Sequence, residues 1–141
     1  MPKNPPLILV SACLAGVPCR YDGEGRERSQ VVHLLKEGRA LPVCPEQLGG
    51  LSTPRAAAEI VGGNVITKDG TDVTANYKAG AEAALLLALK AGVTEAWLKS
   101  KSPMCGCGKI YDGTHSGKLV AGDGVFTALL KKAGIQVKAI D

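Results

Sequence analysis

The stretch PLILVSAC, residues 6–13, is a short apolar run containing β-branched residues that ends at a cysteine. Runs of this length and composition are typical of strands buried on both faces. Three comparable runs follow at residues 40–44 (ALPVC), 95–100 (EAWLKS) and 135–140 (IQVKAI). We therefore predict four strands in these places, with the first strand covering residues 6–12.

Helical patterns separate these strands. Apolar residues recur at helical spacing in residues 29–38, 74–92 and 125–134, and each segment ends at a glycine, the residue that most often closes a helix. A hairpin around Gly62 and Gly63 is predicted in the Gly- and Thr-rich segment between the second strand and the longest helix. Strands that alternate with helices predict an α/β fold with a mainly parallel sheet flanked by helices.

Length and composition favour one domain spanning residues 1–141. The chain is 45% hydrophobic, which is enough apolar material for a core that needs no disulfides. The net charge of +4 is too small to require a nucleic-acid partner. The N-terminal sequence lacks the features of a secretory signal, and no apolar run approaches the length of a membrane span. We expect a soluble, cytoplasmic protein.

The cysteines carry the strongest functional signal. There are five, an odd number, and thiols in a reducing compartment are more often metal ligands or reactive groups than disulfide partners. Cys13, Cys44 and Cys105 each follow a predicted strand. Ligands of open parallel sheets bind beyond the carboxyl ends of the strands, so we expect these three thiols to meet there. A single cysteine in such a place is as readily a small buried apolar residue.

The spacing of the cysteines limits what three thiolates would hold. Structural zinc sites use four ligands, usually in closely spaced pairs, and ferredoxins use clustered C-x-x-C motifs. Neither pattern occurs in this sequence. A cubane held by three cysteines leaves one iron without a protein ligand, and an open metal position allows a substrate to bind the metal directly. This pattern favours a cluster that binds and converts a substrate over one that only carries electrons.

Two polar residues stand close to these cysteines in the sequence. Glu46 follows Cys44 across Pro45, whose fixed backbone angle restricts the direction of the carboxylate. It is a candidate general acid or base, with a solvated surface glutamate or a charge at the start of a helix as the alternatives. Ser102 precedes Cys105 by three residues and is a candidate substrate contact, although a serine before proline is commonly a turn residue.

Four motifs, in order along the chain, resemble the signatures of the TudS-type thiouracil desulfidase family. The resemblance spans nearly the whole sequence. The motifs are SACLAGVPCRYDG (11–23), CPEQLGGLSTPR (44–55), GTDVTANYKAGA (70–81) and KSPMCGCGKIYDG (101–113).

The resemblance implies a Rossmann-like iron–sulfur enzyme. Its [4Fe-4S] cluster would be bound by Cys13, Cys44 and Cys105, with Glu46 as catalytic acid/base and Ser102 contacting the substrate. In the mechanism proposed for the family, the thiocarbonyl sulfur of a thiolated pyrimidine binds the open iron, water activated by the glutamate adds to the ring carbon, and the sulfur leaves as sulfide. The implied partner is a small thiolated pyrimidine base, nucleoside or nucleotide, with neither a membrane nor a stable nucleic-acid complex.

Other residues near these motifs leave alternatives open. Arg20 and Lys101 are candidates for contact with a nucleotide substrate, while pairing with Asp22 is the structural alternative for Arg20. Cys19 and Cys107 are alternative ligands, and either would convert the site into that of a non-catalytic iron–sulfur protein. A third reading, a zinc domain that binds RNA, is disfavoured by the absence of C-x-x-C pairs and by the scarcity of aromatic residues.

Met104 stands where the family more often has a serine. The two histidines, His33 and His115, have no role in the implied mechanism, and only His115 lies near a proposed site motif.

Overall fold

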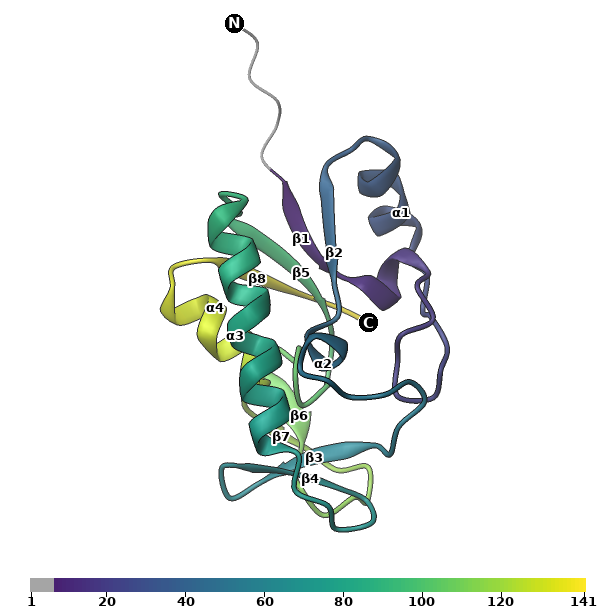
Figure 1. Cartoon of the computed structure of the whole chain (residues 1–141), viewed down its shortest axis with the longest axis vertical. Coiled ribbons are helices and arrows are strands. Elements are labelled where there is room, and N and C mark those ends of the chain that lie inside the picture. The colour runs from purple at the N-terminus through teal and green to yellow at the C-terminus, as the bar shows by residue number, and fades with distance from the viewer. Residues whose placement is uncertain (1–6) are drawn as a thin grey trace, which may run out of the picture.

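A four-stranded parallel sheet forms the centre of the molecule, as described by a computed structural model for residues 7–141 (Figure 1). Its strand order is β2-β1-β5-β8, and every neighbouring pair runs parallel. The strands are β1 (Ile8–Ser11), β2 (Ala40–Val43), β5 (Glu95–Lys99) and β8 (Gln136–Ile140). The predicted α/β fold with a mainly parallel sheet is confirmed.

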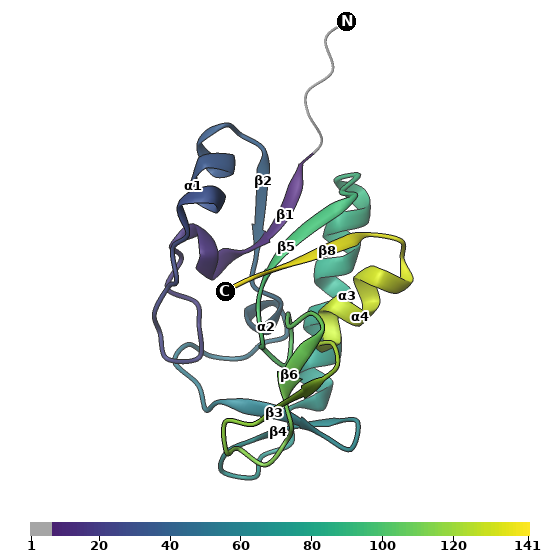
Figure 2. The ribbon, with the colours of Figure 1, turned by 180° about the vertical axis from the view of Figure 1, so that it is seen from behind.

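Helices pack on both faces of this sheet. The long helix α3 (Thr74–Lys90) and α4 (Val125–Lys132) cover one face, where Leu9 of β1 joins the larger apolar core (Figure 1). Ile8 and Val10 belong to a second core on the other face, where α1 (Ser29–Lys36) packs beside β1 and β2 (Figure 2). Because successive side chains of a strand point to opposite faces, β1, all four of whose residues are buried, is covered on both.

Two antiparallel hairpins lie beyond the carboxyl ends of the parallel strands (Figures 1 and 2). The first, β3 (Ala58–Val61) with β4 (Asn64–Thr67), turns at Gly62 and Gly63 as predicted, and both glycines have positive φ angles. The second, β6 (Lys109–Tyr111) with β7 (Leu119–Ala121), was not predicted. All of β7 is exposed, so its sequence has no buried face to identify it as a strand.

A glycine contact brings the short helix α2 (Pro45–Leu48) unusually close to α3. A Cβ atom at Gly80 in α3 would overlap the carbonyl oxygen of Pro45, and one at Gly49 would overlap the carbonyl oxygen of Asn76. The side-chain amide of Asn76 donates a hydrogen bond to the carbonyl oxygen of Gly49 at 2.9 Å. The missing side chains thus allow the two backbones to touch.

The first turn of α4 fixes the loop that carries Cys105. The backbone amides of Gly124, Val125 and Phe126 donate hydrogen bonds to carbonyl oxygens within residues 103–106, at 2.7–2.9 Å. The buried hydroxyl of Thr127 also donates to the carbonyl oxygen of Cys105, at 2.9 Å. Helix-start amides have no partner within their own helix, so the loop satisfies them.

Helix and strand limits agree closely with the sequence patterns. Residue 6, where the first strand was predicted to begin, and the start of the N-terminal segment searched for a signal lie outside the described residues. Within residues 7–141, no helix combines the length and the apolar character needed to cross a membrane.

Candidate iron–sulfur site

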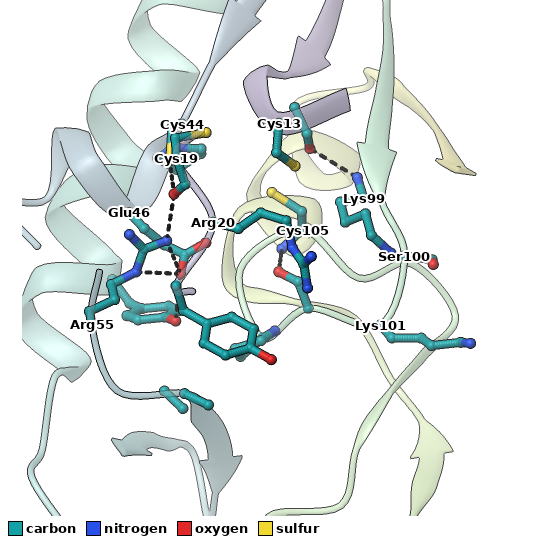
Figure 3. Close-up of a pocket in the computed structure, with 18 of the residues that line it drawn as sticks. Cys13, Cys19, Arg20, Cys44, Glu46, Arg55, Lys99, Ser100, Lys101 and Cys105 are labelled. Atoms are coloured by element: carbon teal, nitrogen blue, oxygen red, sulfur yellow. Dashed lines mark hydrogen bonds and ion pairs between the residues drawn. The ribbon is translucent and has the colours of Figure 1, made fainter. Parts of the chain in front are cut away.

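The three cysteines that follow predicted strands line one cavity of about 450 Å³ (Figure 3). Cys13 lies in a short 3-10 helix (Ala12–Ala15) directly after β1, Cys44 lies between β2 and α2, and Cys105 lies in the loop after β5. These strands are adjacent in the sheet. The convergence at the carboxyl edge therefore follows from the strand order.

The thiols of the cavity interact electrostatically. The strongest influence on Cys13 is a hydrogen bond with Cys19, which lowers the pKa of Cys13, whereas negative charge on Cys105 or Cys44 acts to raise it. The pKa of Cys44 is raised, chiefly by the hydrogen bond between Cys44 and Cys19 and next by burial. Burial, followed by the charge of Glu46, raises the pKa of Cys105. Several thiolates in this cavity would repel one another, so they need a cationic centre between them.

The three thiols that line the cavity are donors of the kind that bind an iron–sulfur cluster. Within residues 7–141, no three His, Cys, Asp or Glu side chains are grouped closely enough to share one metal ion. A single zinc ion requires its ligands at about 2.0–2.3 Å from one point. In a [4Fe-4S] cluster each thiolate binds a different iron, so the ligands stand further apart, and thiolates are the usual donors.

Glu46, the second residue of α2, lines the same cavity. One carboxylate oxygen, Oε2, accepts hydrogen bonds from Nε and Nη2 of Arg55 at 3.2 and 3.0 Å and from the Tyr77 hydroxyl at 3.1 Å (Figure 3). Burial and the adjacent Glu46 raise the pKa of Tyr77, so this hydroxyl stays protonated and donates. The Glu46 side chain is 17% exposed, which leaves part of it open to the cavity.

Ser102 also lines the cavity and has a definite role in the turn. Its Oγ accepts hydrogen bonds from the backbone amides of Met104 and Cys105 at 3.0 and 2.8 Å. The hydroxyl proton remains available for donation to a bound molecule. Met104, where the family more often has a serine, is fully buried in the larger core.

The two remaining cysteines are distinguished by their positions. Cys19 is 2% exposed and lines the cavity, and hydrogen bonding to Cys13 raises the pKa of Cys19 to about 11. Cys107 does not line the cavity, and its Sγ lies 4.0 Å from the carbonyl oxygen of Val137. Of the two alternative ligands, the structure brings Cys19 to the other thiols and keeps Cys107 away from them.

Basic side chains line another side of the cavity. Arg20, Lys99 and Lys101 all contribute to the wall. The Nη1 atom of Arg20 is buried without a hydrogen-bond partner among residues 7–141, although it lies 3.4 Å from a carboxylate oxygen of Asp22. Burial lowers the pKa of Lys99. The predicted pairing of Arg20 with Asp22 is therefore present. The Arg20 side chain also faces the cavity (Figure 3).

Comparison with known proteins places this architecture in one family. The model of the 2-thiouracil desulfurase family matches residues 8–141. The chain belongs to the 2-thiouracil desulfurase family. It is 45% identical to the uncharacterized protein YbbK of Bacillus subtilis (strain 168) over 141 residues, with 93% of each chain covered. It is also similar to the solved structure of the [4Fe-4S]-dependent thiouracil desulfidase TudS, with 50% identity, a TM-score of 0.91, and 96% of this chain and 91% of that chain covered.

The family predicted from the four motifs is confirmed. In this member of the 2-thiouracil desulfurase family, sequence reasoning missed Arg55, Tyr77 and Lys99 as wall residues of the cavity. Arg55 and Tyr77 do lie within two of the family motifs, but no local spacing connects them with Glu46. His33 is exposed on α1, and His115 lies beside Glu59 of β3, with 3.5 Å between Nδ1 and the carboxylate.

Proposed function

We propose that this chain is a [4Fe-4S]-dependent desulfidase that replaces the sulfur of a thiolated pyrimidine with oxygen and releases sulfide. The observation that carries the proposal is the grouping of Cys13, Cys44, Cys105 and Glu46 around one cavity. Membership of the 2-thiouracil desulfurase family and the similarity to the [4Fe-4S]-dependent desulfidase TudS support it.

In this proposal Cys13, Cys44 and Cys105 hold the cluster as thiolates. When bound, the cluster supplies a Lewis-acidic iron that accepts the soft thiocarbonyl sulfur of the substrate. The protein's own residues carry out the other steps of the reaction. Thiols, apolar groups and charged side chains line the cavity together, and electrostatic interactions are stronger where such groups are removed from water.

Glu46 acts as the general base. Its carboxylate removes a proton from water as the water oxygen bonds to the ring carbon, and the carbon–sulfur bond then breaks. Ser102 donates its hydroxyl proton in a hydrogen bond to the pyrimidine. The balance is one thiocarbonyl plus one water giving one carbonyl plus hydrogen sulfide, without oxidant or reductant.

We further propose that a nucleotide is accepted in addition to the free base. Arg20, Lys99 and Lys101 provide positive charge along one side of the cavity, and guanidinium and ammonium groups are the usual partners of phosphate. The buried Nη1 of Arg20 makes an ion pair with Asp22 but no hydrogen bond within residues 7–141, and a phosphate oxygen would supply that bond.

The test is anaerobic reconstitution of the cluster followed by sulfide-release assays with 2-thiouracil, 4-thiouracil and 4-thiouridine monophosphate. Glu46→Gln keeps the shape of the side chain and removes the base. We expect this variant to retain its iron and to lose about 10²–10⁴-fold in kcat. Turnover equal to that of the unmodified protein would remove Glu46 from the mechanism.

A second candidate function rests on Cys19. Because this buried thiol lines the cavity with the other three, it is placed to act as a fourth ligand and close the cluster, as in a non-catalytic iron–sulfur protein. In the desulfidase proposal, Cys19→Ser retains a full complement of iron and sulfide release continues. Loss of the cluster in Cys19→Ser, together with absence of turnover in the unmodified protein, favours the non-catalytic candidate.

A further inference from the structure

Among residues 7–141, the side-chain hydrogen bonds of Glu46 are all accepted by one of its two carboxylate oxygens. Oε2 accepts two bonds from Arg55 and one from Tyr77, at 3.0–3.2 Å. No group within residues 7–141 donates a hydrogen bond to Oε1, and Oε1 is not among the buried atoms that lack a partner. A carboxylate held in this way has one saturated oxygen and one that remains free toward the cavity.

All five N–H donors of the Arg55 side chain make hydrogen bonds. A guanidinium group has five N–H donors in a rigid plane. Arg55 uses Nε and one Nη2 donor on Glu46, and the second Nη2 donor on the carbonyl oxygen of Cys19 at 3.1 Å. Its two Nη1 donors bind the Ser52 carbonyl oxygen at 3.2 Å and the Thr53 hydroxyl at 3.0 Å. The side chain is 8% exposed, so little freedom of rotation is left.

These contacts join Glu46 to the segment that carries the thiols. The carbonyl oxygen of Cys19 that binds Arg55 lies 3.8 Å from Sγ of Cys44. Tyr77 is 2% exposed and belongs to α3. The glycine contact between α3 and α2 brings this helix close to the segment that carries Glu46. The loop after α2, through Arg55, and helix α3, through Tyr77, therefore fix the orientation of one carboxylate relative to the cysteines.

We propose that Arg55 and Tyr77 are positioning residues that hold Glu46 by Oε2 and present Oε1 to the cavity as the oxygen that removes the proton from water. This inference rests on the proposed desulfidase function. General-base catalysis needs the accepting atom within hydrogen-bond reach of the proton, and small displacements of catalytic groups are costly. Without these two residues, the carboxylate rotates about its side-chain bonds and Oε1 leaves its place.

The test uses Tyr77→Phe, which removes only the hydroxyl, and Arg55→Lys, which retains the charge and loses the planar fork. We expect kcat to fall by about 10-fold in Tyr77→Phe and about 10- to 100-fold in Arg55→Lys, in line with hydrogen bonds to charged groups. KM and iron content should remain close to those of the unmodified protein. Arg39→Lys, at the other end of β2 and outside the cavity, is the matched control.

A double variant separates positioning from general structural support. If Tyr77 acts through Glu46, then adding Tyr77→Phe to Glu46→Gln produces no further loss of kcat, because coupled residues are not additive. Independent losses that multiply in the double variant would contradict the inference, as would unchanged kcat in both single variants.

The outcomes also distinguish this inference from the function on which it rests. Absence of sulfide release from the reconstituted, unmodified protein defeats the proposed function. Sulfide release that depends on Glu46 but is unaffected by Tyr77→Phe and Arg55→Lys defeats the positioning roles alone. If Arg55→Lys loses iron or fails to fold, the kcat of Tyr77→Phe, which lacks only one hydroxyl, tests the inference.

Discussion

At the scale of single residues, Cys105 and Cys107 differ sharply although only Gly106 separates them. Cys105 is 4% exposed, lines the cavity and has its carbonyl oxygen held by Thr127. Cys107 is partly exposed and lies outside the cavity wall. Cys105 belongs to the turn at residues 103–105, and the chain has left this turn by Cys107, so the two thiols make a natural matched pair for experiment.

We predict that Cys105→Ser loses cluster iron on anaerobic reconstitution and that Cys107→Ser retains it. Serine is close in shape but is a poor ligand for iron in place of a thiolate. Iron and acid-labile sulfide per chain are the measurements, with folding checked by circular dichroism. Equal iron in both variants would remove Cys105 from the ligand set.

At the scale of elements, the contact between α2 and α3 determines the position of Glu46. Gly80 lies in the middle of a helix, where glycine is unfavourable by about 1 kcal/mol relative to alanine. Its value lies in the close approach to the Pro45 carbonyl, one residue before Glu46. Glycine therefore makes the helix itself less stable but allows the two backbones to approach each other.

Gly80→Ala should therefore destabilise the protein despite its better helix propensity. We expect a loss of about 1–3 kcal/mol in the free energy of unfolding, the usual cost of overpacking. Glu82→Ala, exposed on the same helix, is the control and should change stability little. Urea unfolding of the two variants provides the comparison, and a Gly80→Ala protein more stable than the parent would refute the packing argument.

At the scale of the whole molecule, the cavity joins segments that follow three different strands. A cluster bound there would connect residues that are far apart in the chain. Any ligand that binds the folded state but not the unfolded chain raises stability. We predict a higher Tm for the reconstituted protein than for the same protein without cluster, by anaerobic calorimetry. An identical Tm for the cluster-free protein and for a fully loaded sample would contradict this.

The sequence predicted those parts of the molecule that depend on local patterns. The apolar runs located the strands, and the rule for parallel sheets led to the meeting of Cys13, Cys44 and Cys105 in one cavity. Their role as ligands stays a prediction, as do the roles of Glu46 and Ser102. Tyr77 was missed because its contact with Glu46 depends on the packing of α3 against α2, which has no periodic signal in the sequence. Arg55 was missed because it lies in the loop after α2, where no periodic pattern indicates the direction of a side chain.

The proposed function requires that three cysteines hold a [4Fe-4S] cluster with one iron open to a sulfur-bearing substrate. The decisive measurement is Mössbauer spectroscopy of protein reconstituted with ⁵⁷Fe, before and after addition of 4-thiouracil. We expect about one quarter of the iron signal to change on addition of the thiolated base, since one iron of four lacks a thiolate. A cluster spectrum that does not change, with all irons already fully ligated by protein, would contradict it.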